Sequence, residues 1–223
     1  RTLCVTLPIH QVQAQVDRAG EHVRRLTERY SNAEAAHADL TAAYDAFAGS
    51  FAPSLVQGAG KGVADLAGAN ARSRLRMTAL YYFAGLNNLL VAGTGNKIED
   101  FGVGFFTKYG DGGVDISPIA DLTKTEVYEL GRWLRVPEAI LVAPPTDGLF
   151  GDDRTDEQQI GATYPELERA MAHAERGTDP ALLSGREREV YDIFLRRNRA
   201  NRHKMEPIPV CRIPRHLVEP AGR

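Results

Sequence analysis

The stretch Leu89-Leu-Val-Ala-Gly-Thr-Gly-Asn-Lys-Ile-Glu99 joins four apolar residues to a glycine-bearing turn that ends in a carboxylate. A short apolar run bounded by turn signals is typical of a buried strand, so we expect a strand over Leu89–Ala92. In α/β folds ligands bind where strands end, and this turn follows the carboxyl end of the predicted strand. The stretch therefore indicates both a fold class and a place for a binding site.

Strand-like and helix-like patterns alternate along the rest of the chain. Strand-like runs lie at 3–7 and 38–41, and apolar periodicity predicts helices at 12–30, 42–51, 63–86, 123–134, 157–161, 165–174 and 184–201. Thr123 and Ser184 each open a capping-box sequence, with a glutamate three residues later. The alternation predicts an α/β fold with a largely parallel sheet, organised as a single domain over 1–223 without repeats or a linker.

Composition excludes several classes of protein. The 223 residues carry 27 basic and 29 acidic side chains, a net charge of -2, whereas a protein that coats nucleic acid or an anionic membrane favours a strong basic excess. No apolar run approaches the roughly 18 residues of a membrane-spanning helix. Cys4 and Cys211 are too few for a disulfide framework. We therefore expect a cytoplasmic protein that has neither a nucleic acid nor a membrane as its partner.

Chemistry-bearing residues gather after the predicted strand. In Gly93–Glu99 the glycines allow close approach to a nucleotide, and Glu99 offers a hard oxygen ligand for Mg²⁺, although such a turn is often only structural. The segment Phe105–Asp115 combines Lys108 with two carboxylates and several glycines, which is typical of a loop that orders a ligand. Asp111 precedes a glycine and also fits an ordinary turn.

Two basic segments admit structural and functional interpretations. Arg72, Arg74 and Arg76 lie on an otherwise apolar helix, so at least one of them needs a buried or ligand partner. The run from Arg196 to Lys204 fits a solvated helix end, where cations complement the helix dipole, and spacing alone favours that interpretation.

Taken together, these segments resemble the ammonia-dependent NAD synthetase family, within the N-type ATP pyrophosphatase superfamily. The resemblance is carried by Asn70–Met77, Gly93–Glu99, Phe106–Asp115, Pro118–Lys124, Pro145-Thr146, Asp156-Glu157 and His203-Lys204. It covers the chain from Leu3 to about Pro209. The segment that holds Lys108 and Asp115 speaks against other ATP pyrophosphatases, such as tRNA-modifying or GMP-synthesising enzymes.

The resemblance implies a Rossmann-like, doubly wound and mainly parallel sheet flanked by helices, of the adenine nucleotide alpha hydrolase type. It implies an AMP-forming ligase that adenylates deamido-NAD with ATP and Mg²⁺ and then admits ammonia, giving NAD, AMP and pyrophosphate. By motif position, ATP contacts fall on Thr94, Lys124 and Thr146, and the metal ligand on Glu99. Contacts to deamido-NAD fall on Arg74, Lys108, Asp115, His203 and Lys204.

The family also implies a homodimer, for which the apolar helix ending near Leu86 is a suitable interface. We expect the glycine-bearing segments 54–62 and 148–154 to act as mobile lids over bound nucleotides.

The sequence departs from the family in one respect. The family begins with a pyrophosphate-binding Ser-Gly-Gly-x-Asp-Ser loop that is not present here, and Thr2–Leu7 matches its second strand. Because the chain begins with Arg1 and not with Met, we expect that a first strand, loop and helix precede it in the native protein. The alternatives are a non-catalytic nucleotide-binding homologue, or a loop supplied by another chain. The catalytic residues stay unassigned, and we expect the chain alone to adenylate poorly.

Overall fold

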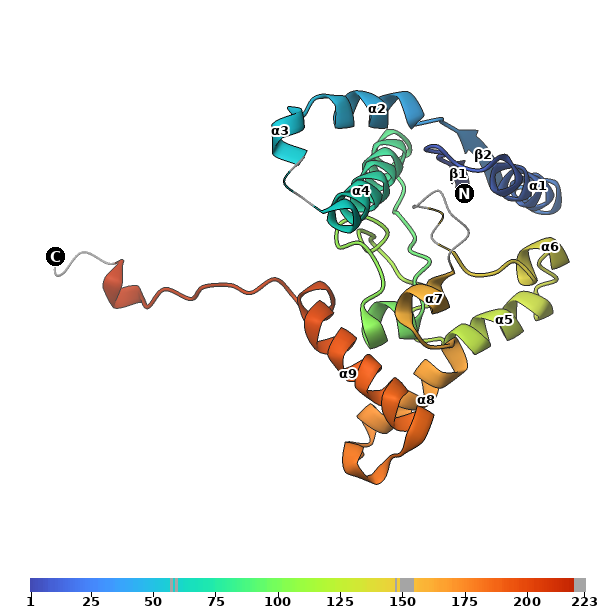
Figure 1. Ribbon diagram of the computed structural model, residues 1–223. Coiled ribbons are helices and arrows are strands. Elements are labelled where there is room, and N and C mark those ends of the chain that lie inside the picture. The colour runs from blue at the N-terminus through green and yellow to red at the C-terminus, as the bar shows by residue number, and fades with distance from the viewer. Residues whose placement is uncertain (57, 59, 147, 149–154, 219–223) are drawn as a thin grey trace.

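The chain begins with a strand–helix–strand unit. The computed structural model describes residues 1–56, 58, 60–146, 148 and 155–218. Strands β1 (Thr2–Thr6) and β2 (Ala33–His37) pair in parallel, with Thr2 opposite Ala33 and Thr6 opposite His37. Helix α1 (Gln13–Arg29) makes the crossover that parallel neighbours require, and it lies beside the two strands (Figure 1).

The strand predicted at 38–41 is wrong, because the second strand lies earlier. In β2 the sequence is Ala-Glu-Ala-Ala-His, without a β-branched or aromatic residue, so its strand state comes from pairing with β1 and not from propensity. The Asp39 carboxylate accepts the backbone N–H of Thr41 at 2.8 Å, and Thr41 begins helix α2 (Thr41–Gly49).

The strand predicted over Leu89–Ala92 is also wrong. This segment is extended, but Ala92 forms only an isolated parallel bridge with Ile116. The Asp115 carboxylate accepts the Val91 N–H at 2.8 Å, so a side chain occupies the place of a strand neighbour there. Leu90 is 68% exposed, whereas Val91 is buried. The segment is therefore buried on one side alone, and this explains why the apolar run does not form a central strand.

Helix α4 is the longest element that the structure describes. It spans Lys61–Asn87, follows the short α3 (Pro53–Val56) and ends at Asn88, which has a left-handed φ of 52°. Arg76 on α4 donates from Nε to the Leu7 carbonyl at 2.9 Å. This bond ties the helix to the carboxyl end of β1. Figure 1 shows α2 and α3 arching over α4.

From residue 98 onward, the named elements that the structure describes are all helices. They are η1 (Ile98–Val103), α5 (Lys124–Trp133), α6 (Glu138–Leu141), α7 (Asp156–Ile160), α8 (Tyr164–Glu175), η2 (Pro180–Leu182), α9 (Gly185–Met205) and η3 (Arg215–Leu217). Among them η1, α8 and α9 share the main core, with Val103, Leu167 and Val190 almost fully buried. After α9 the chain extends away from the body (Figure 1).

Of the two capping boxes predicted from the sequence, the structure confirms one and contradicts the other. Thr123 and Glu126 form the predicted capping box at the start of α5. At Ser184 the predicted box is wrong, because the Glu187 carboxylate pairs with His173 Nε2 at 2.9 Å instead of turning back to the cap. Helix α9 also runs on to Met205, past the predicted end at Asn201.

A parallel strand pair flanked by helices confirms the predicted α/β class. None of the described helices combines the length and the apolarity needed to cross a bilayer. The lids expected at 54–62 and 148–154 fall in part on residues 57, 59 and 149–154, which lie outside the described residues.

The start of α8 provides a stability test. The Glu166 carboxylate accepts from Arg186 Nε and from the Thr163 N–H, each at 2.8 Å, and these donors lower the pKa of Glu166 from 4.5 to about 2. A depressed folded-state pKa contributes stability that is present above pH 4.5 and is lost as the pH falls through about 2. Because Arg186 is half exposed, we expect Glu166→Gln to cost only about 1 kcal/mol at neutral pH.

Denaturant unfolding at neutral and at acid pH measures this difference, which should vanish as the pH approaches 2. Glu189→Gln is the matched control, because Glu189 pairs with the same Arg186 at 3.1 Å but is 62% exposed. An effect of Glu166→Gln that is equal at all pH values would contradict the electrostatic explanation.

Candidate functional site

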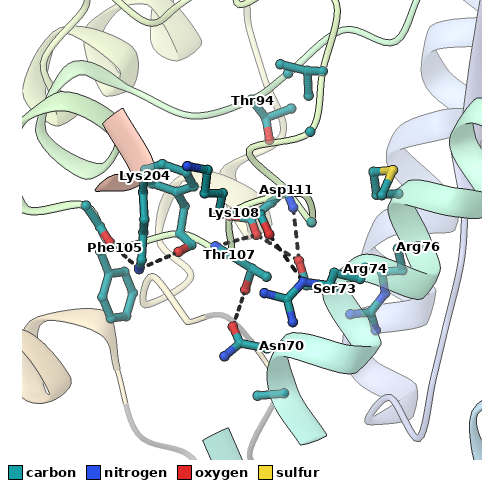
Figure 2. Close-up of a pocket in the computed structure, with 18 of the residues that line it drawn as sticks. Asn70, Ser73, Arg74, Arg76, Thr94, Phe105, Thr107, Lys108, Asp111 and Lys204 are labelled. Atoms are coloured by element: carbon teal, nitrogen blue, oxygen red, sulfur yellow. Dashed lines mark hydrogen bonds between the residues drawn. The ribbon is translucent and has the colours of Figure 1, made fainter. Parts of the chain in front are cut away.

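A pocket of about 850 Å³ lies between α4, the loop over residues 104–114 and the C-terminal part of α9 (Figure 2). Five of the residues assigned from the sequence line it, namely Arg74, Thr94, Lys108, His203 and Lys204. They come from the helix, the turn after residue 92, the loop and the end of α9. The fold thus gathers residues that are up to 130 positions apart (204 − 74) around one space.

The loop that forms one wall is fixed to α4 by a small polar network. Asp111 Oδ1 accepts from Ser73 Oγ at 2.8 Å and from the Thr107 N–H at 2.9 Å. Thr107 Oγ1 donates to Asn70 Oδ1 at 2.6 Å, as Figure 2 shows. A Cβ at Gly110 would lie 2.3 Å from Ser73 Oγ, so only glycine permits this close approach. The structural interpretation of Asp111 is therefore confirmed.

The cationic side chains of the pocket hydrogen-bond to neutral carbonyl oxygens. Arg74 Nε donates to the Lys108 carbonyl at 3.2 Å, and Lys108 Nζ donates to the His203 carbonyl. Lys204 Nζ donates to two carbonyls of the loop, at 2.9 and 2.8 Å. These bonds orient the cations without neutralising their charge.

Two further arginines line the same space. Arg76 donates to the Leu7 carbonyl and to Gln11 Oε1, and Arg197 donates to the Gln159 carbonyl. The pocket thus holds five cationic side chains, and Asp111 is the one acid among its described lining residues. No ion pair between these cations and a carboxylate occurs within the described part of the chain. Burial lowers the pKa of Arg76 and of Lys204, which is the mark of desolvated cations. Such a pocket favours a multiply charged anion.

A second cluster lies outside that lining. Lys124 Nζ donates to Glu99 Oε1 at 2.8 Å, and the Tyr164 hydroxyl lies 2.5 Å from the same oxygen. The hydroxyl is also 3.3 Å from Asp156 Oδ2, and Lys124 Nζ stands 4.8 Å from the centre of the tyrosine ring. Burial and then the charge of Glu99 raise the pKa of Tyr164. The assigned Lys124 and Glu99 are therefore brought together, as an ion pair.

Asp115 and Thr146 are not among the residues that line the pocket, although Asp115 is hydrogen-bonded to the lining residue Val91. Asp115 accepts from the Val91 N–H and from the Tyr81 hydroxyl, the latter at 3.1 Å. Thr146 Oγ1 accepts the Gly148 N–H at 3.2 Å. Their roles toward deamido-NAD and ATP stay predictions.

The second cluster fits a magnesium ion only in part. Mg²⁺ takes oxygen ligands, commonly from one or two carboxylates together with substrate phosphates. Glu99 supplies one carboxylate. The Asp156 carboxylate lies 3.3 Å from the same Tyr164 hydroxyl that contacts Glu99. No group of three or more potential ligand side chains occurs in the described part of the chain. Among the described residues, the arrangement therefore suits a metal that arrives with a phosphate ligand.

Sequence patterns assigned no individual role to Arg76 or Arg197, which line the pocket, or to Tyr164, which belongs to the second cluster. A signal for Arg197 was present, because Arg197, Asn201 and Lys204 are four and three residues apart and so share one helix face, which lines the pocket. No comparable signal existed for Tyr164, because Glu99 and Lys124 come from segments 65 and 40 (164 − 124) positions away in sequence.

The family model described as NAD synthase matches residues 1–208. The NH(3)-dependent NAD(+) synthetase of Carboxydothermus hydrogenoformans is 45% identical over 139 residues, which are 62% of this chain and 52% of that protein. The chain thus spans about half the length of this curated relative.

Two solved structures share the fold. An NMN synthetase from Francisella tularensis aligns with a TM-score of 0.77 at 30% identity, over 95% of this chain and 79% of the other. An NAD+ synthetase from Burkholderia pseudomallei aligns with a TM-score of 0.61, also at 30% identity, over 92% and 69%. The predicted Rossmann-like α/β architecture agrees with both.

The charge of the pocket predicts anion binding. We expect millimolar pyrophosphate to raise the melting temperature by a few degrees relative to chloride at equal ionic strength, since a ligand of the folded state stabilises it. Arg74→Gln should reduce this rise, whereas Arg25→Gln, which removes an exposed arginine paired with Glu21, should not. Equal responses of both variants and the unchanged protein would refute an anion site in this pocket.

Proposed function

The chain belongs to the NAD synthase family, and we propose that the protein carrying it converts deamido-NAD to NAD with ATP and ammonia. The observation that carries this proposal is the pocket of about 850 Å³, whose five cations lack carboxylate partners among the described residues. A dinucleotide brings a pyrophosphate and a nicotinate carboxylate, which are the anions that such a pocket requires.

The reaction follows from the chemistry of a carboxylate. A carboxylate oxygen is a poor leaving group, so the nicotinate oxygen first attacks the α-phosphorus of ATP, and the bond to pyrophosphate breaks. Ammonia then attacks the acyl carbon, AMP leaves with the former carboxylate oxygen, and the nitrogen loses a proton to solvent. The protein has to align the reactants and offset the phosphate charge, which are positioning and electrostatic tasks.

The described residues suit a division of these tasks. We assign deamido-NAD to Arg74, Lys108, His203 and Lys204, which line the pocket, and retain Asp115 on its motif position alone. ATP is assigned to Thr94, Lys124 and Thr146. Only Thr94 among these lines the pocket, so the ATP site would extend from there toward the second cluster.

Glu99 is the residue that would hold Mg²⁺. A bound Mg²⁺ would offset charge on the phosphates of ATP. In this structure Glu99 Oε1 is taken by Lys124 and Tyr164, while no described residue hydrogen-bonds to Oε2. The free oxygen is the one available to a cation.

A second substrate has support from one comparison. The solved structure with a TM-score of 0.77 is an NMN synthetase, whereas the NAD+ synthetase from Burkholderia pseudomallei has 0.61 at the same identity. The corresponding substrate is nicotinate mononucleotide, which presents the same carboxylate on a smaller nucleotide. Both candidates use the same chemistry and differ in the size of the bound molecule.

The decisive assay measures pyrophosphate release from ATP by the intact protein. We expect release to require Mg²⁺ and deamido-NAD, and NAD to form when ammonium is present. Nicotinate mononucleotide is the parallel substrate, and a higher kcat/KM with it would favour the second candidate. Absence of release with either substrate would reject the ligase function, and glutamine in place of ammonium is the control for the nitrogen source.

We also propose that the protein is a cytoplasmic homodimer that buries the end of α4. Tyr82, Leu86 and Leu90 lie at or just after this end and are 67%, 65% and 68% exposed. Exposure of several large apolar side chains at one place in the fold is typical of an interaction surface. Both cysteines are free, which agrees with a reducing compartment.

The dimer is tested by one charge on this surface. Leu86→Glu should convert the dimer to a monomer in sedimentation experiments, because a carboxylate in an apolar interface is strongly unfavourable. Leu182→Glu is the matched control, since Leu182 is 79% exposed on η2, outside the α4 surface. A wild-type monomer, or a dimer that survives Leu86→Glu, would contradict the proposed interface.

A further inference from the structure

Tyr164 is a buried residue to which no role has been assigned, and it joins several helices. Its side chain is only 3% exposed. It is the first residue of α8, and its hydroxyl reaches Glu99 on η1 and Asp156, the first residue of α7. Its ring supports the ammonium of Lys124, the first residue of α5. Three helix starts and η1 therefore meet at one phenol.

The phenol carries a single hydrogen, which it can donate to one carboxylate at a time. The hydroxyl lies 2.5 Å from Glu99 Oε1 and 3.3 Å from Asp156 Oδ2, so the geometry assigns the hydrogen to Glu99. A phenol has an ordinary pKa of about 10, so the hydroxyl is protonated at neutral pH and acts as a donor.

Glu99 Oε1 thus accepts from two donors, and these differ in how firmly the structure holds them in place. Lys124 Nζ lies 2.8 Å from it, but the proposed function requires this ammonium to turn toward ATP. A lysine side chain has four rotatable bonds and moves easily, whereas a buried tyrosine is held by its neighbours. Tyr164 is the donor that remains when Lys124 leaves.

We propose that Tyr164 is a positioning residue that holds Glu99 Oε1, so that Oε2 stays directed at the cation accompanying ATP after Lys124 has turned to the phosphates. This inference rests on the proposed function and deepens it. It assigns Tyr164 no contact with substrate.

The test is Tyr164→Phe, which removes only the hydroxyl. Loss of a group that orients a metal ligand typically weakens metal affinity about 10- to 100-fold. We therefore expect the Mg²⁺ concentration for half-maximal rate to rise at least tenfold, with the KM for deamido-NAD unchanged. Binding of Mn²⁺ in the presence of ATP, measured by calorimetry or electron paramagnetic resonance without deamido-NAD, should weaken by the same factor.

Tyr191→Phe is the matched control. Tyr191 is also 3% exposed and belongs to the same core, but its hydroxyl donates to the Thr178 carbonyl at 3.2 Å, away from the cluster. It should leave the metal requirement unchanged. A merely structural role of Tyr164 predicts instead a lower melting temperature with no selective change in metal affinity.

The outcomes separate this inference from the function on which it rests. If the wild-type protein binds no Mn²⁺ with ATP, both fall. If it binds Mn²⁺ and Tyr164→Phe binds it equally well, only the role of Tyr164 is overturned. Should Tyr164→Phe fail to fold, Asp156→Asn decides: a metal requirement within about threefold of wild type supports Glu99 as the partner of the hydroxyl. A tenfold rise would place Asp156 at the cation and overturn the proposal.

Discussion

The rest of the site depends on the hydrogen bonds that the Asp111 carboxylate accepts. This carboxylate accepts from Ser73 on α4 and from the Thr107 N–H within its own loop, and so holds the loop against the helix. The loop in turn presents Lys108 and the carbonyls that receive Lys204. Without this anchor the pocket would lose one wall and the partners of its cations. A residue that looks like an ordinary Asp-Gly turn thus determines where the ligand-binding groups stand.

The choice of carbonyls as partners has an electrostatic consequence. A lysine or arginine paired with a carboxylate would be neutralised, whereas a carbonyl orients the cation and leaves its charge available. The whole chain has a net charge of only -2, yet the pocket concentrates five cations around a single acid among its described residues. Local charge, and not overall composition, is therefore what suits this protein to a phosphate-rich ligand.

The sequence predicted the α/β class and most helices, because periodicity and capping depend on near neighbours. It placed the first strand correctly and misplaced two others. Ala33–His37 becomes a strand only through pairing with β1, and the apolar run at Leu89 has only an isolated bridge to Ile116 on one side. The assigned pocket residues were found through motifs, and Arg74, Lys108 and Lys204 do line one space. Tyr164 could not be found, because its role arises from contacts 65 and 8 positions away.

One segment links the pocket to the carboxylate cluster. Glu99 is the second residue of η1, and the carbonyl of Gly104, just past the end of η1, accepts a hydrogen bond from Lys204 Nζ. Asn201 Nδ2 donates to the Val103 carbonyl at 2.9 Å, and a Cβ at Gly104 would lie 2.3 Å from the Asn201 Cβ, so α9 fits closely against this end of η1. Such packing fixes Glu99 and Lys204 relative to each other. Under the proposed function, adjustment to ATP would fall to Lys124, whose side chain can turn without moving the scaffold, and Glu99 would then need a second donor.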